Sequence, residues 1–177
     1  MIQDLTKSRS YETLKQVQGD KSGLFTRPSE IIDNADVFID SNIFIYHFSG
    51  LEKFADACFH FFKRIEEGSI SGHTSTLVLA EVLHRLMIIE ASEKFGFLPK
   101  EVIKYLKANP DKITSLTDYL DSISYIEKLG ISILTVSLKD IKLGSEFKRK
   151  FMLFTNDAIN LAVIKNDDLV KSPNLSP

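Results

Sequence analysis

Apolar residues along this chain follow two alternating patterns: short unbroken runs, and longer stretches with helical spacing. The unbroken runs predict buried strands at residues 36–40, 69–74 and 131–136. Helical spacing predicts helices at 42–48, 52–67, 77–95, 101–108 and 115–129, another beginning near 137, and a last one from about Asn156. Because strands alternate with helices, the pattern predicts an α/β domain with a buried parallel sheet.

The first part of the chain differs from the rest. It is polar and sparsely hydrophobic, Gly19, Gly23 and Pro28 interrupt it, and its one candidate helix lies near Tyr11–Val17. We therefore expect a polar N-terminal extension at 1–34, a globular domain at 35–170 and a tail at 171–177.

Composition narrows the class of protein. The 44% hydrophobic and 26% charged residues are typical of a globular domain, and a net charge of -2 means that any nucleic-acid surface must be local. The single cysteine, Cys58, excludes an intramolecular disulfide, and its apolar neighbours favour a buried side chain over a nucleophile. The sequence contains no apolar run of membrane-spanning length and no secretory signal pattern, so we expect a cytoplasmic protein without a membrane partner.

Three carboxylates stand in apolar surroundings: Asp40, Glu81 and Asp157. Burying a carboxylate without a partner costs several kcal/mol, and few cationic residues lie nearby in the sequence. A shared divalent cation would solve this problem for all three, and oxygen ligands favour Mg²⁺ or Mn²⁺. Asp40 also ends the first predicted strand, at the edge where open parallel sheets bind ligands.

Each carboxylate also has a purely structural interpretation. Asp40 could cap the following helix, and Asp157 could complement a helix N-terminus, although Thr155 or Asn156 already offers a cap there. Glu81 could pair with Arg85 one helical turn later. Together these interpretations require three separate explanations, whereas one metal site explains all three residues.

These residues lie in three segments that resemble the motifs of PIN domains. The segments are Val37–Phe44, Thr74–Val82 and Leu153–Ala162, in the family's order and spacing. The resemblance covers roughly Asp36 to Ile164 and implies a three-layer α/β/α sandwich with a short parallel sheet. It also implies a Mg²⁺- or Mn²⁺-dependent endoribonuclease acting on RNA. Many small bacterial and archaeal members are VapC-type toxins that a cognate antitoxin neutralises and that often form homodimers.

The resemblance assigns Asp40, Glu81 and Asp157 as catalytic, metal-holding residues. Further side chains could orient these ligands or bind phosphate, although each could equally be a cap or turn residue: Asn42, Thr74, Ser75, Thr155 and Asn156. The densest basic cluster, Lys148–Lys150 with Lys142, could follow an RNA backbone, but a solvated helix face is the favoured interpretation. The histidines have no zinc-ligand spacing and receive no role.

One departure from the family stands beside the resemblance. PIN domains carry another acid on a strand after the third motif, whereas the sequence continues for only about twenty residues beyond Asp157. We expect one or more C-terminal strands to be missing, and Asp167 and Asp168 to be solvated residues past a helix end. A catalytically impaired PIN-fold binding module is therefore the main alternative. A phosphatase of the haloacid dehalogenase type would need Asp-x-Asp, and Asn42 occupies the second position.

Overall fold

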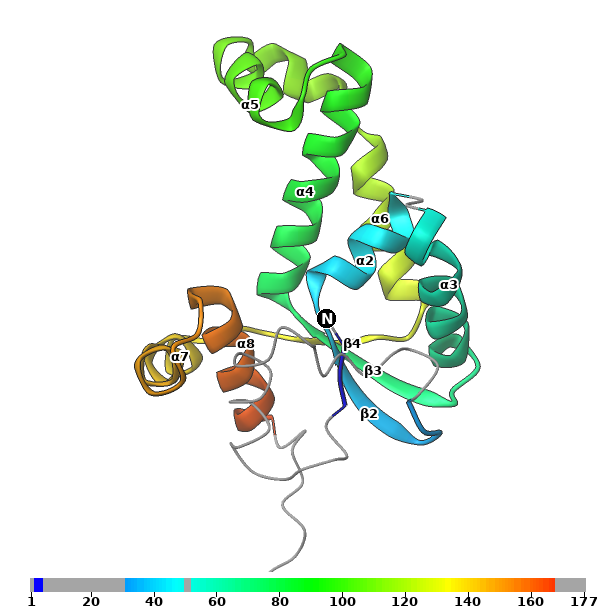
Figure 1. Ribbon diagram of the computed structural model, residues 1–177, viewed down its shortest axis with the longest axis vertical. Coiled ribbons are helices and arrows are strands. Elements are labelled where there is room, and N and C mark those ends of the chain that lie inside the picture. Colours follow the sequence, from blue (N-terminus) through cyan, green and yellow to red (C-terminus); the bar gives the residue numbers. More distant parts are fainter. Residues whose placement is uncertain (1, 5–30, 50–51, 168–177) are drawn as a thin grey trace, which may run out of the picture.

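A short, mostly parallel sheet organises the chain in the computed structural model (Figure 1), which describes residues 2–4, 31–49 and 52–167. Within these ranges the strands lie in the order β1 (Ile2–Asp4), β2 (Ala35–Ile39), β3 (Ile70–Ser75), β4 (Ser132–Leu134). β2, β3 and β4 run parallel, which confirms the predicted parallel sheet, and β1 pairs antiparallel with β2. The sequence pattern did not predict β1.

Helices account for most of the remaining described residues. They are α2 (Ser41–Phe48), α3 (Glu52–Glu66), α4 (Thr76–Phe95), α5 (Pro99–Ala108), the 3₁₀ helix η2 (Pro110–Ser115), α6 (Asp118–Lys128), α7 (Leu138–Phe151) and α8 (Thr155–Asn166). The predicted helices are present, and the one expected near residue 137 continues to Phe151. In Figure 1, α2, α4 and α6 lie above the sheet, α3 lies to the right, and α7 and α8 form a hairpin to the left. This mixed α/β arrangement is compatible with an α/β/α sandwich.

The main core lies between the sheet and the helices around it. Phe44 and Phe62 are almost fully buried, with ring centroids 5.3 Å apart in a stacked arrangement. Gly72 lets α3 approach the sheet closely, because a Cβ atom there would lie 2.9 Å from Cδ1 of Ile65. Cys58 is 2% exposed, and burial raises the pKa of its thiol. The prediction of a buried cysteine is confirmed.

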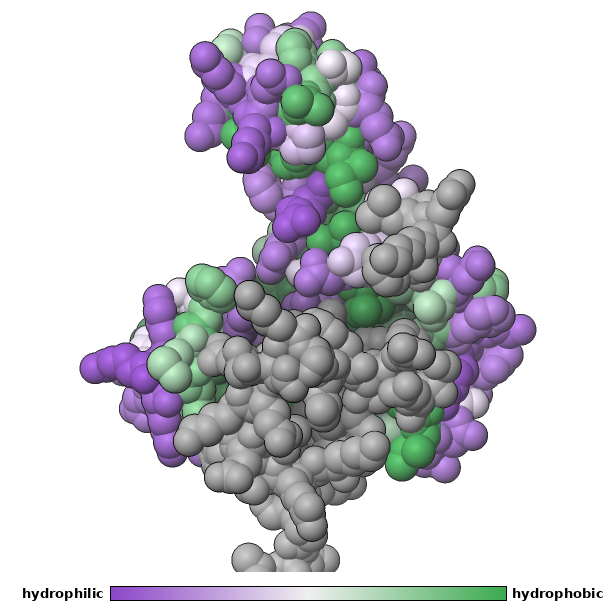
Figure 2. All heavy atoms as spheres, viewed as in Figure 1, coloured by the Kyte–Doolittle hydropathy of each residue, from purple (hydrophilic) through white to green (hydrophobic). Residues whose placement is uncertain are grey.

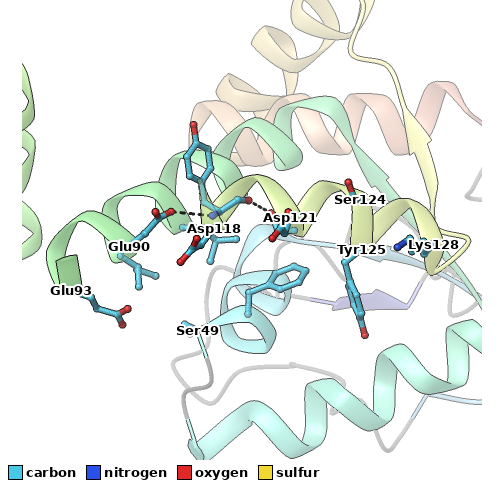
Figure 3. A pocket seen from close by; sticks show the side chains of 13 residues that line it. Ser49, Glu90, Glu93, Asp118, Asp121, Ser124, Tyr125 and Lys128 are labelled. Atoms are coloured by element: carbon cyan, nitrogen blue, oxygen red, sulfur yellow. Dashed lines mark hydrogen bonds between the residues drawn. The ribbon is translucent and has the colours of Figure 1, made fainter. Parts of the chain in front are cut away.

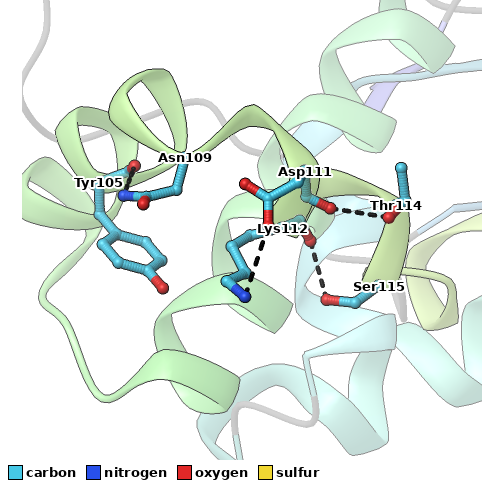
Figure 4. A network of polar contacts seen from close by, with 6 residues as sticks. All are labelled: Tyr105, Asn109, Asp111, Lys112, Thr114 and Ser115. Atoms are coloured by element: carbon cyan, nitrogen blue, oxygen red, sulfur yellow. Dashed lines mark hydrogen bonds and ion pairs between the residues drawn. The ribbon is translucent and has the colours of Figure 1, made fainter.

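A second, smaller core forms an arm at the far end of α4. It contains Ile88, Ala91, Val102, Leu106 and Leu116. The arm closes with η2, whose last turn is held by short local bonds (Figure 4). The Thr114 hydroxyl donates to the Asp111 carbonyl at 2.7 Å, and the Ser115 hydroxyl donates to the Lys112 carbonyl at 2.8 Å. Such bonds are typical of hydroxyl side chains in tight turns.

The predicted domain boundaries lie partly outside the described residues. Those residues do not include the candidate helix at 11–17 or the tail at 171–177. At the end of the predicted extension, Ile31 is 3% exposed and belongs to the main core. Arg64 donates hydrogen bonds to the Ile31 carbonyl at 2.7 Å and to Asp33 Oδ1 at 2.8 Å. Within the described ranges, no helix combines the length and the apolar character needed to cross a bilayer.

Candidate active-site cleft

A cleft of about 350 Å³ collects the three predicted acids from distant parts of the sequence. Its lining residues come from the start of α2, the second turn of α4 and the start of α8: Asp40, Ser41, Asn42, Glu81, Phe154, Thr155, Asn156 and Asp157. Because β2, β3 and β4 are parallel, the segments that follow them begin at one edge of the sheet. Six of the eight residues that the sequence singled out line this cleft, and Thr74 and Ser75 do not.

Asp40 directly follows β2 and occupies the N-cap position of α2. Its backbone carbonyl accepts the Ile43 amide at 3.2 Å, but its side chain makes no capping bond. The side chain instead accepts a hydrogen bond from the Asn42 amide, with 3.1 Å between Nδ2 and Oδ2. The capping interpretation therefore does not explain the Asp40 carboxylate. Asn42, one of the residues expected to orient the acids or bind phosphate, contacts Asp40 directly.

Glu81 lies in the second turn of α4 and is half-buried. In the described part of the chain it forms no ion pair with Arg85, so that structural interpretation fails as well. Its partner comes from α8: Asn156 Nδ2 lies 3.4 Å from Glu81 Oε2, at the long end of the hydrogen-bond range. Asn156 thus links the second acid to the helix that carries the third.

Asp157 lies in the first turn of α8, where its side chain remains exposed at the cleft. The N-cap position is taken by Phe154, without a side-chain bond, so the expected cap from Thr155 or Asn156 is not formed. Partial desolvation in the cleft raises the pKa of Asp157, and the negative charges of Asp40 and Glu81 raise it further. The charges of Asp40 and Glu81 are therefore close enough to act on the Asp157 carboxyl.

The two hydroxyl residues before α4 have structural partners. Thr74 is fully buried, and its hydroxyl donates to the Ile39 carbonyl at 3.0 Å, which ties β3 to β2. Ser75 caps α4 by accepting the Val78 amide at 3.1 Å, and its hydroxyl donates to Asn160 Oδ1 at 2.7 Å. This second bond fixes α8 to the end of β3.

Asn160 is a residue that the sequence analysis missed. It is 8% exposed, and it lies three residues after Asp157, one helical turn along α8. The sequence carries a signal, because a polar residue here interrupts the apolar run of Ala158, Ile159, Leu161 and Ala162. A buried amide in such company needs a hydrogen-bond partner, and Ser75 supplies it.

The α7–α8 hairpin positions Asp157 and is tied at both ends. At the turn, Lys148 Nζ donates to the Thr155 hydroxyl at 2.9 Å. At the other end, Asp140 is 5% exposed, forms a capping box with Ser137, and accepts a bond from the Asn166 amide. Burial alone would raise the pKa of Asp140, but these hydrogen bonds outweigh burial and lower it.

The acids do not form a preassembled metal cluster. Among residues 2–4, 31–49 and 52–167, no three His, Cys, Asp or Glu side chains are close enough together to hold one metal ion. Asp167 occupies the C-cap of α8, at the opposite end of that helix from Asp157, and it is exposed as expected. Asp168 lies outside the described residues. His73 pairs with Asp36 at 3.2 Å rather than lining the cleft.

A larger cavity of about 600 Å³ lies between α2, α4 and α6 (Figure 3). Its wall includes acidic residues and the aromatic rings of Phe48, Tyr119 and Tyr125. Among these acids, Glu90 accepts hydrogen bonds from the backbone amides of Thr117 at 2.9 Å and Tyr119 at 3.0 Å. It therefore supplies partners for the first amides of α6, a structural role, and none of the predicted site residues lies here.

Comparisons with protein-family models, with curated proteins and with solved structures return no match to this chain. The functional interpretation therefore rests on the residues of the cleft and on the resemblance of the three motifs.

Proposed function

We propose that this chain is a PIN-type endoribonuclease that cleaves RNA phosphodiester bonds with Mg²⁺ or Mn²⁺. The observation that carries the proposal is the convergence of Asp40, Glu81 and Asp157 in one cleft, where partial desolvation and then the charges of Asp40 and Glu81 raise the pKa of the Asp157 carboxyl. Like charges gathered at an open site are costly, and a shared cation removes that cost.

The donor chemistry of the cleft fits a hard divalent cation. Every acidic group that lines it is a carboxylate, and the neighbouring donors are amides and hydroxyls. Asp40, Glu81 and Asp157 would hold the ion. Because no three of the described acids form a cluster, binding requires their side chains to turn toward one another. Glu81 and Asp157 are long or exposed enough to do so, since Glu81 has three rotatable bonds and Asp157 faces solvent.

A bound cation of this kind lowers the pKa of a water molecule and stabilises charge on the phosphate. The chain itself contributes orientation. Asn42 donates a side-chain hydrogen bond to Asp40 Oδ2, and Asn156 donates one to Glu81 Oε2, so each amide orients one carboxylate. Asn160 fixes the helix that carries Asp157. Lys148, bonded to Thr155 at the cleft, is placed to meet an incoming phosphate.

The test is cleavage of single-stranded RNA by the full chain in Mn²⁺, compared with Asp40→Asn and with Asp167→Asn. Asp167 provides a matched control because it is an exposed aspartate at the other end of α8. We expect Asp40→Asn to lower cleavage at least a hundredfold and Asp167→Asn to leave it unchanged. Equal cleavage by the wild type and Asp40→Asn would overturn the proposal, as would cleavage that persists in EDTA.

A binding module with a catalytically impaired site is the second candidate. The absence of a preassembled three-ligand cluster among the described residues favours it. Calorimetric titration with Mn²⁺ separates the candidates, because a nuclease must bind the ion and lose that binding in Asp40→Asn. Heat of binding that is undetectable in the wild type would favour the inert module.

The resemblance to VapC-type toxins leads us to propose two further partners, a cognate antitoxin and a second copy of the chain. A small antitoxin gene adjacent to the gene for this chain, whose product suppresses RNA cleavage when added to the purified protein, is the expected result. Sedimentation measures the second partner directly. A monomer whose activity no neighbouring gene product inhibits would contradict this part of the proposal.

A further inference from the structure

The turn between α7 and α8 presents two large apolar side chains to solvent. Met152 is 83% exposed and Phe154 is 84% exposed, and they lie two residues apart. Met152 adopts a left-handed conformation with φ of 56°, a position at helix ends that glycine usually fills. Burying side chains of this size would favour folding by about 1.5–3 kcal/mol each, so their exposure calls for an explanation outside the core.

The two side chains differ in their relation to the cleft. Phe154 belongs to its lining, together with Asp40 and Asp157, whereas Met152 does not. The lining of the cleft therefore combines three carboxylates with one exposed aromatic side chain. Every nucleotide base has a flat apolar face that stacks on such a ring.

Basic residues flank the same turn. The last turn of α7 carries Lys148, Arg149 and Lys150, all exposed. Lys148 is held at the cleft by its 2.9 Å bond to Thr155, the residue that follows Phe154. An aromatic ring beside a fixed ammonium group is the combination with which proteins hold single-stranded nucleic acid, the ring under a base and the ammonium on the backbone.

We infer that Phe154 is a stacking platform for one unpaired base next to the scissile phosphodiester, with Lys148 contacting a neighbouring phosphate. This inference rests on the proposed ribonuclease function and specifies its substrate as single-stranded RNA. A protein partner fits this surface less well, because the residues around Phe154 in the turn are mostly polar and exposed: Lys148, Arg149, Thr155, Asn156 and Asp157. In Figure 2 the apolar atoms over the α7–α8 hairpin have hydrophilic atoms along their outer side.

The first experiment is a comparison of cleavage kinetics on a short single-stranded RNA in Mn²⁺. Phe154→Leu keeps the apolar character but removes the ring, Phe154→Tyr keeps the ring, and Met152→Leu is the matched control on the same turn. We expect Phe154→Leu to raise KM roughly 5- to 150-fold, the range for loss of one base–aromatic stack. Phe154→Tyr and Met152→Leu should keep the wild-type KM. A substrate that lacks the base at the stacking position should make the wild type and Phe154→Leu equal.

The second experiment measures binding without cleavage. The chain has no tryptophan, so Phe154→Trp and Met152→Trp each introduce a single fluorescent reporter. Oligoadenylate added in Ca²⁺ should quench Phe154→Trp, since a stacked base quenches indole emission, and should leave Met152→Trp unchanged.

The outcomes separate this inference from the proposed function. A wild-type KM for Phe154→Leu, together with unquenched Phe154→Trp, would overturn the platform while the ribonuclease remains. Absence of cleavage together with quenched Phe154→Trp would remove the ribonuclease and leave the platform. If Phe154→Leu instead dissociates a dimer and leaves the KM for RNA unchanged, the surface is a protein interface and the inference is overturned.

Discussion

The hydrogen bond between Ser75 and Asn160 should prove to be one of the stronger links between the sheet edge and α8. Ser75 is fully buried and Asn160 is 8% exposed, and their oxygens lie 2.7 Å apart. Asn160→Ala would leave a buried hydroxyl proton without its acceptor. Losing one partner of a buried hydrogen bond costs about 1–3 kcal/mol. Ser75→Ala removes the same bond and also the cap of α4, for a further loss of about 1 kcal/mol.

A double-mutant cycle in urea measures this link. We expect the single variants to lose about 2 and about 3 kcal/mol of unfolding free energy, with no change in the urea dependence. The double variant should lose about 1 kcal/mol less than the sum, because both substitutions break the same bond. Ser145→Ala is the control, since this exposed hydroxyl bonds only within its own helix, to Ile141 at 2.9 Å. It should change stability by less than about 0.5 kcal/mol.

If the two single effects simply added, Ser75 and Asn160 would not interact, because strict additivity excludes a coupling energy. An Asn160→Ala effect as small as that of Ser145→Ala would likewise contradict a link between α8 and the sheet edge. In the expected case Asn160→Ala also weakens RNA cleavage, since Asp157 lies one turn away on the same helix.

Three more predictions concern the hairpin and the cleft. Gly144→Ala should destabilise the fold by about 1–2 kcal/mol in thermal unfolding, although alanine favours helices, because the new Cβ would lie 3.0 Å from the Ile159 Cα. Asp140→Asn should destabilise the fold at neutral pH, and its difference from the wild type should vanish in acid. The lowered folded-state pKa of Asp140 adds stability above its unfolded pKa, and this stability is lost as pH falls through the folded-state pKa. Asp157→Asn should behave oppositely and stabilise the metal-free protein at neutral pH. A raised folded-state pKa means that the wild-type Asp157 carboxyl adds stability below its unfolded pKa. That added stability is lost as pH rises through the folded-state pKa. Added NaCl should shrink this gain, since the repelling charges are screened.

The strands and helices could be predicted from the sequence because the spacing of their apolar residues follows from which side chains are buried. The runs at 36–40, 69–74 and 131–136 became β2, β3 and β4 with shifts of one or two residues at their ends. The pattern could not predict β1, because Ile2–Asp4 is three residues long and pairs with a strand more than thirty residues away. Such a short segment becomes a strand only through its partner.

The site residues that could be predicted are those whose side chains differ from their sequence neighbours, as the three carboxylates do in apolar segments. Thr74 and Ser75 illustrate the limit, because a hydroxyl before a helix can face a ligand, a backbone carbonyl or the helix itself. Their actual bonds, to Ile39 and Asn160, depend on which segments meet in three dimensions. The exposure of Phe154 could not be predicted for the same reason. Nothing in the sequence Met-Leu-Phe distinguishes an exposed ring from a buried one.

The α7–α8 hairpin has an apolar cluster of its own, made by Phe147, Phe151, Ala158 and Ala162, separate from the main core. A unit with its own core can detach while the rest of the molecule stays folded. The Ser75–Asn160 bond and the burial of Ile164 in the main core oppose such opening. In Asn160→Ala, heating should therefore release the hairpin, and Asp157 with it, below the global melting temperature. The cleft would in this way be lost at a lower temperature than the one at which the whole protein unfolds.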